Sequence, residues 1–99
     1  MLHLLRHAPH TDPSFASCLR AIAAGQNLLL LEDAVYALLP ATNQSQALGF
    51  LPASIRIYAI ESDLLGRGLA LDAVPARVQL IDYPRFVELC VAHEKVISW

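Results

Sequence analysis

Four consecutive leucines, Leu28–Leu31, constrain the fold of this chain more than any other segment. A run that is apolar at every position leaves no face for water, so it predicts a strand that is buried on both sides. Such strands are typical of a parallel sheet covered by helices. Glu32 and Asp33 follow at the carboxyl end of this strand, where α/β sheets hold their functional groups. The apolar segment Ala34–Leu39 then predicts a short helix that stops at Pro40.

Strand and helix signals alternate along the whole chain. Further strands are predicted at Leu2–Leu5, Ile55–Ile60 and Val78–Ile81. Helices are predicted from an Asp12 N-cap and Pro13 to near Gly25, around Asn43–Phe50, from Ser62-Asp63 to Gly66-Arg67-Gly68, and from Pro84 to about His93. We therefore expect a single domain over residues 1–99 with an α/β fold of three layers. Its mostly parallel sheet of four to five strands has helices on both faces.

The composition indicates an oligomer. Apolar residues make up 56% of the 99 residues and charged residues 16%, against about 45–50% and about 25% in ordinary domains. A small domain has little core for its surface, so part of this apolar surplus is expected at partner interfaces. The net charge of −2 makes direct nucleic-acid binding unexpected, because such domains carry a basic face.

The termini and the cysteines favour a cytoplasmic protein. The start of the chain lacks the basic segment and the long apolar run of a signal peptide, and no stretch approaches the length of a membrane span. Cys18 and Cys90 are far apart and form no CxxC motif, so free thiols are expected.

Three carboxylates, Asp33, Asp63 and Asp82, each follow a predicted strand. They suit general acid–base chemistry or metal binding. Each also stands near the start of a predicted helix, where a carboxylate accepts hydrogen bonds from unpaired N–H groups. The sequence favours this capping role.

Cys18 is the candidate nucleophile, as a possible persulfide carrier. A reactive thiol needs exposure and a lowered pKa, commonly from a helix N-terminus or a nearby cation. Cys18 lies about two turns into the first predicted helix, on a face shared with Phe15, Leu19 and Ile22. These neighbours favour a packed core thiol, and Cys90 on the last helix has the same interpretation.

The segment Arg6-His7 is similar to the Arg-His signature of histidine phosphatases, in which the His accepts the phosphoryl group. Those enzymes need a second His, and the only late one here is His93. The alternative is a polar loop after the first strand.

No metal or cofactor is expected. The four histidines, at positions 3, 7, 10 and 93, have no ligand spacing with each other or with the cysteines. The chain also has no GxGxxG motif and no P-loop.

A series of segments resembles the DsrH/TusB family, the small subunit of sulfur-relay complexes. No single segment is specific for this family, but the order of the segments and the length of the chain together are. The segments are Met1-Leu2-His3, Ser17-Cys18-Leu19, Leu28–Leu38, Ile57–Ile60, Asp63-Leu64 with Arg67-Gly68-Leu69, Ile81-Asp82-Tyr83 with Phe86-Val87, and Trp99.

The resemblance implies a DsrE/F/H-like fold and a dimer of heterotrimers with DsrE/TusD-like and DsrF/TusC-like subunits. It implies passage of persulfide sulfur toward 2-thiouridine at the tRNA wobble position, or a role in dissimilatory sulfur oxidation with Cys18 as a carrier. The principal sulfur-carrying cysteine belongs to the DsrE/TusD subunit, so a structural or accessory role is expected here. Two residues depart from the family pattern: Ala34 stands where Gly is common, and His7 where Ser is common.

Overall fold

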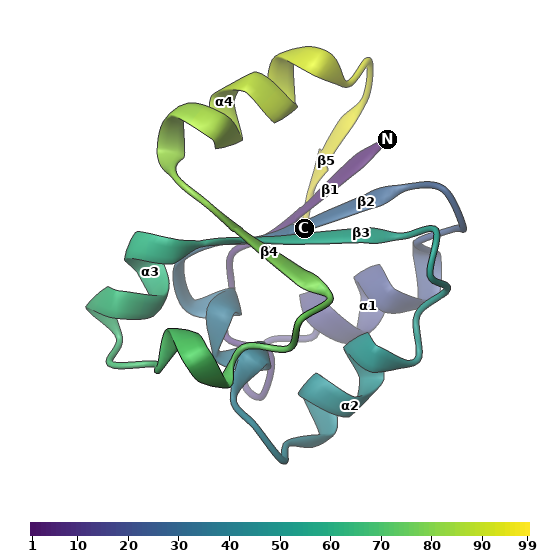
Figure 1. Ribbon diagram of the computed structural model, residues 1–99. Coiled ribbons are helices and arrows are strands. Elements are labelled where there is room, and N and C mark those ends of the chain that lie inside the picture. Colours follow the sequence, from purple (N-terminus) through teal and green to yellow (C-terminus); the bar gives the residue numbers. More distant parts are fainter.

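The computed structural model describes residues 1–99, which form one five-stranded sheet and six helical segments (Figure 1). In chain order these are β1 (Leu2–Leu5), α1 (Ser14–Ala21), β2 (Asn27–Leu30), the 3-10 helix η1 (Glu32–Leu38), α2 (Asn43–Gly49), β3 (Arg56–Ile60), α3 (Glu61–Gly66), the 3-10 helix η2 (Leu71–Ala73), β4 (Val78–Ile81), α4 (Tyr83–Ala92) and β5 (Val96–Ser98). None of the helices combines the length and the apolar composition needed to cross a bilayer; α4, the longest, has 10 residues.

The sheet has the strand order β4-β3-β2-β1-β5, and every neighbouring pair is parallel. The leucine run supplies β2, which pairs with β1 on one side and β3 on the other, with Leu29 beside Leu4 and Tyr58. Residues 28 to 30 are fully buried, so the prediction of a strand covered on both faces is confirmed.

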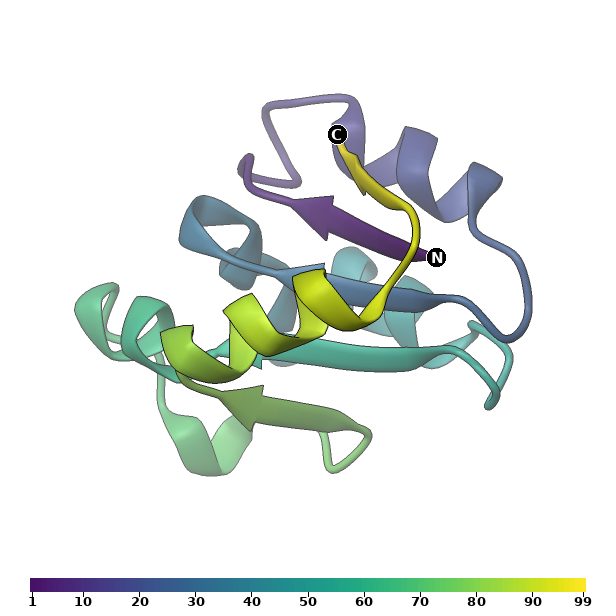
Figure 2. The same ribbon diagram turned by 90° about the horizontal axis from the view of Figure 1, so that it is seen from above.

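The order of the strands explains where the helices lie. The chain steps from β1 to β2, β3 and β4 in one direction, and right-handed crossovers place all helices of these connections on one face. The connection from β4 to β5 crosses back over the sheet, which puts α4 on the opposite face. Figures 1 and 2 show α4 alone on its face and α1 and α2 on the other. The predicted three-layer architecture is therefore confirmed.

Each face of the sheet has its own apolar cluster. The cluster beneath α1, η1 and α2 contains 16 buried residues, among them Phe15, Cys18 and Leu28. The cluster beneath α4 contains eight, and Leu89 is its only helical member. The two clusters meet only through the sheet, because successive strand residues point to opposite faces.

Several element bounds differ from the sequence prediction. The first helix ends at Ala21, short of Gly25, and Asp12 lies one residue before its N-cap, Pro13, where its Oδ1 accepts a hydrogen bond from the N–H of Ser14 at 2.8 Å. The helix predicted after Asp33 is a 3-10 helix that already begins at Glu32. The strand β5 is not among the four strands predicted individually. It is three residues long and exposed along its length, so it has no burial pattern.

Arg77 closes the C-terminal end of α2, a role for which the sequence carries no signal. Its Nη1 donates to the carbonyl oxygens of Leu48 at 3.1 Å and Leu51 at 2.7 Å, and its Nη2 donates to those of Pro52 and Ile55. The last carbonyls of a helix have no partner within it, and a planar guanidinium can reach several of them together. Arg77 thus fixes the segment that leads into β3.

Replacement of Arg77 with Ala is expected to lower the free energy of unfolding by about 1.5–3 kcal/mol, because charge-assisted hydrogen bonds are lost and carbonyls are left unpaired. Arg77→Lys should recover only part of this loss, since a single ammonium cannot reach every acceptor. Urea unfolding measures both. Arg20→Ala is the control, because Arg20 is exposed and bonds only to Ser17. Equal losses in the Arg77→Ala and Arg20→Ala variants would contradict the clamp.

Candidate functional site

Polar side chains gather at the carboxyl edge of β2, β3 and β4. Arg67 Nε donates to Asp33 Oδ1 at 2.9 Å, and Arg67 Nη1 lies 3.8 Å from Asp63 Oδ1. The hydrogen bond to Asp33 is the largest cause of the raised pKa of Arg67. The structure therefore brings two of the three predicted carboxylates together through one guanidinium.

Asp63 is the hub of this edge. Its Oδ2 accepts a hydrogen bond from the backbone N–H of Glu32 at 2.8 Å, and the Tyr83 hydroxyl donates to the same carboxylate at 3.1 Å. Partial burial and then the bond to Asp63 raise the pKa of Tyr83. Asp63 thus connects the start of η1, the helix α3 and the start of α4.

The capping prediction has a different outcome for each carboxylate. Asp82 is the N-cap of α4 and accepts from the N–H of Arg85 at 2.9 Å, as predicted. For Asp33 the prediction is wrong: the residue lies inside η1, whose N-cap is Leu31, and its carboxylate pairs with Arg67. Asp63 leaves its own helix without a side-chain cap and binds the first N–H of η1 instead.

Glu32 adopts a left-handed backbone conformation with a φ of +52°, which is uncommon for a residue with a Cβ. The hydrogen bond from its N–H to Asp63 holds this conformation. Ala34 has no positive φ and is fully buried in η1. The left-handed turn after β2 therefore lies at Glu32, two residues before Ala34, the position where the family resemblance leads to the expectation of Gly.

Cys18 lies inside the larger apolar cluster and is fully buried. Burial raises its pKa to about 12. Because the thiolate is the nucleophile, the folded chain holds this thiol in its unreactive form at neutral pH. The geometry favours a core thiol, and the carrier role stays a prediction that needs local opening around α1. Cys90 on α4 is half-buried, and desolvation raises its pKa as well.

Two of the histidines have structural partners. His3 Nε2 lies 2.8 Å from Gln26 Oε1, and the Trp99 indole donates to His3 Nδ1 at 3.1 Å. His93 Nδ1 lies 2.7 Å from the carbonyl oxygen of Leu89. No group of three or more His, Cys, Asp or Glu side chains is placed to hold a metal ion.

The structure keeps the two histidines of the phosphatase interpretation apart. His7 follows the carboxyl end of β1 and is exposed. His93 lies 2.7 Å from the side chain of Asn27, at the amino end of β2. All strands run in the same direction, so the carboxyl end of β1 and the amino end of β2 lie at opposite ends of the strands. The two histidines are therefore far apart, and no site for a phosphohistidine reaction is assembled.

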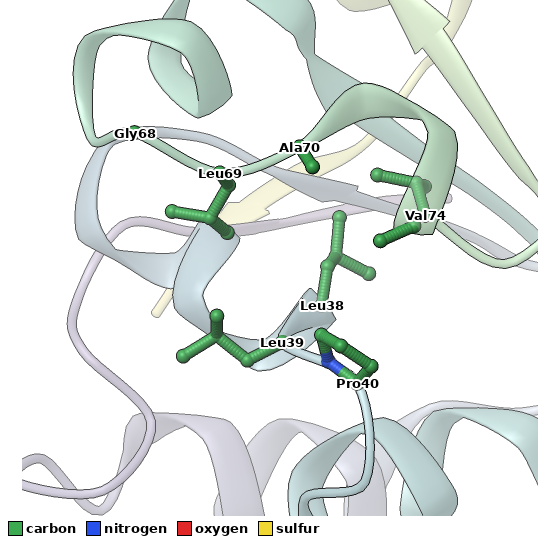
Figure 3. Close-up of a pocket in the computed structure, with 8 residues that line it drawn as sticks. Leu38, Leu39, Pro40, Gly68, Leu69, Ala70 and Val74 are labelled. Carbon is green, nitrogen blue, oxygen red and sulfur yellow. The ribbon is translucent and has the colours of Figure 1, made fainter.

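An apolar cavity of about 200 Å³ lies between the end of η1 and the connection from α3 to η2. Figure 3 shows Leu38 and Val74 projecting into the same space. Its lining is Leu38, Leu39, Pro40, Gly68, Leu69, Ala70, Ala73 and Val74. No polar side chain enters it, so it offers shape to an apolar group but no catalytic chemistry.

A family model described as DsrH like protein matches residues 7–96. The chain belongs to the DsrH family. It is 39% identical over 100 residues to Protein TusB of Escherichia coli strain K12, with 100% of both chains covered. Protein TusB of Shigella dysenteriae serotype 1 is 38% identical over the same length.

Solved structures show the same fold at low sequence identity. The crystal structure of ychN protein from E. coli has a TM-score of 0.77 and 18% identity, and covers 99% of this chain and 97% of its own. The structure of MTH1491 from Methanobacterium thermoautotrophicum, a protein of unknown function, has a TM-score of 0.74 and 14% identity over 99% of this chain and 96% of its own. The fold of this DsrH-family chain therefore also occurs in proteins of low sequence identity to it.

In this DsrH-family chain the polar groups of the carboxyl edge form hydrogen bonds and ion pairs with one another. The carboxylates of Asp33 and Asp63 are taken up by Arg67, Tyr83 and the N–H of Glu32. Sequence reasoning missed Arg67 and Tyr83 as members of this network. Both stand in segments that carry the family resemblance, but no local spacing shows that they bond to Asp33 and Asp63. The arrangement joins the start of η1, the helix α3 and the start of α4.

Glu32→Gly is expected to keep or raise the free energy of unfolding, by up to about 1 kcal/mol, because Gly adopts the left-handed conformation without a Cβ penalty. The matched substitution Ala34→Gly should lower it by about 1 kcal/mol, since Ala34 is helical and buried. Chemical denaturation measures the pair. The reverse ranking of the two variants would contradict the assignment of the turn.

Alkylation of the native chain at pH 8 should label Cys18 about a thousandfold more slowly than in urea, because a thiol with a pKa of about 12 is rarely ionised at that pH. Peptide mass mapping gives the rate at each cysteine, and the unfolded chain is the control. Labelling of native Cys18 at a rate close to that of the unfolded chain would overturn the core interpretation and favour the carrier role.

Proposed function

We propose that this chain is a structural or accessory subunit of a cytoplasmic sulfur-relay complex that passes persulfide sulfur toward 2-thiouridine at the tRNA wobble position. The full-length match to Protein TusB at 39% identity carries this proposal. Its partners are DsrE/TusD-like and DsrF/TusC-like subunits in a dimer of heterotrimers. These assignments rest on the resemblance of the sequence to the family.

Two features support an accessory role. The only cysteine in the position of a carrier, Cys18, is fully buried. The outer face of α4 carries Pro84, Val87 and Val91, and the residues Val87 and Val91 are 57% and 82% exposed. Three apolar residues on the solvent side of a helix form an exposed apolar patch, which suits a helix that packs against another subunit.

The second candidate is a DsrH-type subunit of dissimilatory sulfur oxidation, with Cys18 as a persulfide carrier. The presence of a cysteine on α1 favours it. The two candidates differ in what Cys18 must do inside the assembled complex. Persulfide on Cys18 after incubation of the complex with a sulfur donor, detected by mass mapping, would support the second candidate over the first.

Co-expression with both sister subunits is expected to give a stable hetero-oligomer, which size-exclusion chromatography with light scattering detects. Val91→Lys should weaken this assembly at least about tenfold, because it places a charge in an apolar contact, while the fold of the isolated chain is unchanged. Gln46→Lys, on the exposed side of α2, is the matched control and should assemble normally. A chain that stays monomeric beside both partners would overturn the proposal.

A further inference from the structure

Residues 82–99 form α4 and β5, and we call this segment the C-terminal strap. Figure 2 shows it running diagonally across the sheet and then along the edge of β1. Of the 25 buried residues of the chain, the strap contributes only Leu89. Ordering a residue costs conformational entropy wherever it lies, so the strap has far less burial per residue to offset that cost than residues 1–81.

Two polar contacts fasten α4 at its ends. At the start of the helix, the Tyr83 hydroxyl donates to Asp63 at 3.1 Å. At its end, the side-chain nitrogen Nδ2 of Asn27 lies 2.7 Å from His93 Nε2. Between these tethers Leu89 is the only buried residue, with the half-buried Phe86 and Cys90 packed beside it. The helix is therefore held by its two ends and by one small apolar contact centred on Leu89.

The attachment of β5 is equally slight. This strand has three residues, pairs only with β1, and leaves its other edge open. Val96 and Ile97 remain 40% and 38% exposed. After the strand, the Trp99 N–H bonds to the carbonyl oxygen of Leu4 and the indole bonds to His3. Short edge strands with open backbone groups are among the first parts of a sheet to open.

We propose that the C-terminal strap opens as one unit while residues 1–81 stay folded. Opening uncovers the sheet face beneath α4 and makes β1 an edge strand. The apolar side chains on that face, Leu2, Leu4, Leu29 and Tyr58 among them, keep the open form a minor state in water. The strap thereby controls access to one face and one edge of the sheet, a property separate from the sulfur-relay assignment.

Native-state hydrogen exchange of the full chain, read by mass spectrometry at low denaturant, tests the strap. Amides of α4 and β5 should exchange at least about tenfold faster than those of β2 and β3, with a weaker dependence on denaturant. The helix α1 on the opposite face is the internal comparison, and its amides should exchange at rates similar to those of the central strands. One common rate and one common denaturant dependence for all these elements would overturn the proposal.

Variants that remove the tethers sharpen the test. Tyr83→Phe and Asn27→Ala each delete one hydrogen bond and should speed exchange in α4 and β5 about two- to tenfold, with no change in α1 or β2. Ser54→Ala is the control, since it removes a hydrogen bond to the N–H of Gly25, away from the strap. If the tether variants speed hydrogen exchange equally in every element, the chain opens as a single cooperative unit and the proposal is wrong.

Discussion

The burial of β2 on both faces is the constraint on which the rest of the molecule depends. A strand made of leucines cannot face water on either side, so the sheet needs cover above and below, and the connections must supply it. Three connections run in one direction and cover one face, which leaves the single return connection to cover the other. The unequal helix layers therefore follow from the strand order and from the handedness of crossovers.

The same constraint explains the polar network at the carboxyl edge. Helices that leave a buried parallel sheet begin at one edge, and their first N–H groups need acceptors there. Asp63 supplies one for η1 and Asp82 one for α4, while Arg67 offsets the charge of two carboxylates. Residues that look catalytic by position thus stabilise the junction between strands and helices.

The sequence predicted the elements that burial dictates and missed those that long-range contacts dictate. The runs at residues 2–5 and 28–30 became strands because both of their faces are buried, whereas the edge strand β4 buries only Val78 and Ile81. Asp82 became a cap because capping is local. The roles of Asp33 and Asp63 depend on Arg67, which lies 34 positions from Asp33, so no local pattern shows the pairing. The left-handed turn at Glu32 depends in the same way on a distant acceptor. Exposed β5 gave no pattern, since its register comes from β1 and not from its own side chains.

The helix α4 has two apolar sides, and they answer to different needs. Its inner side closes the smaller core through Leu89, with Phe86 and Cys90 packed beside it. Its outer side presents Val87 and Val91, which remain mostly exposed. A subunit that bound this outer side only when α4 is docked would stabilise the closed strap by its own binding energy, because a ligand that prefers one state shifts the population toward it. Weak attachment of the strap and an apolar outer face then become parts of one arrangement, in which assembly completes a fold that the isolated chain holds less firmly.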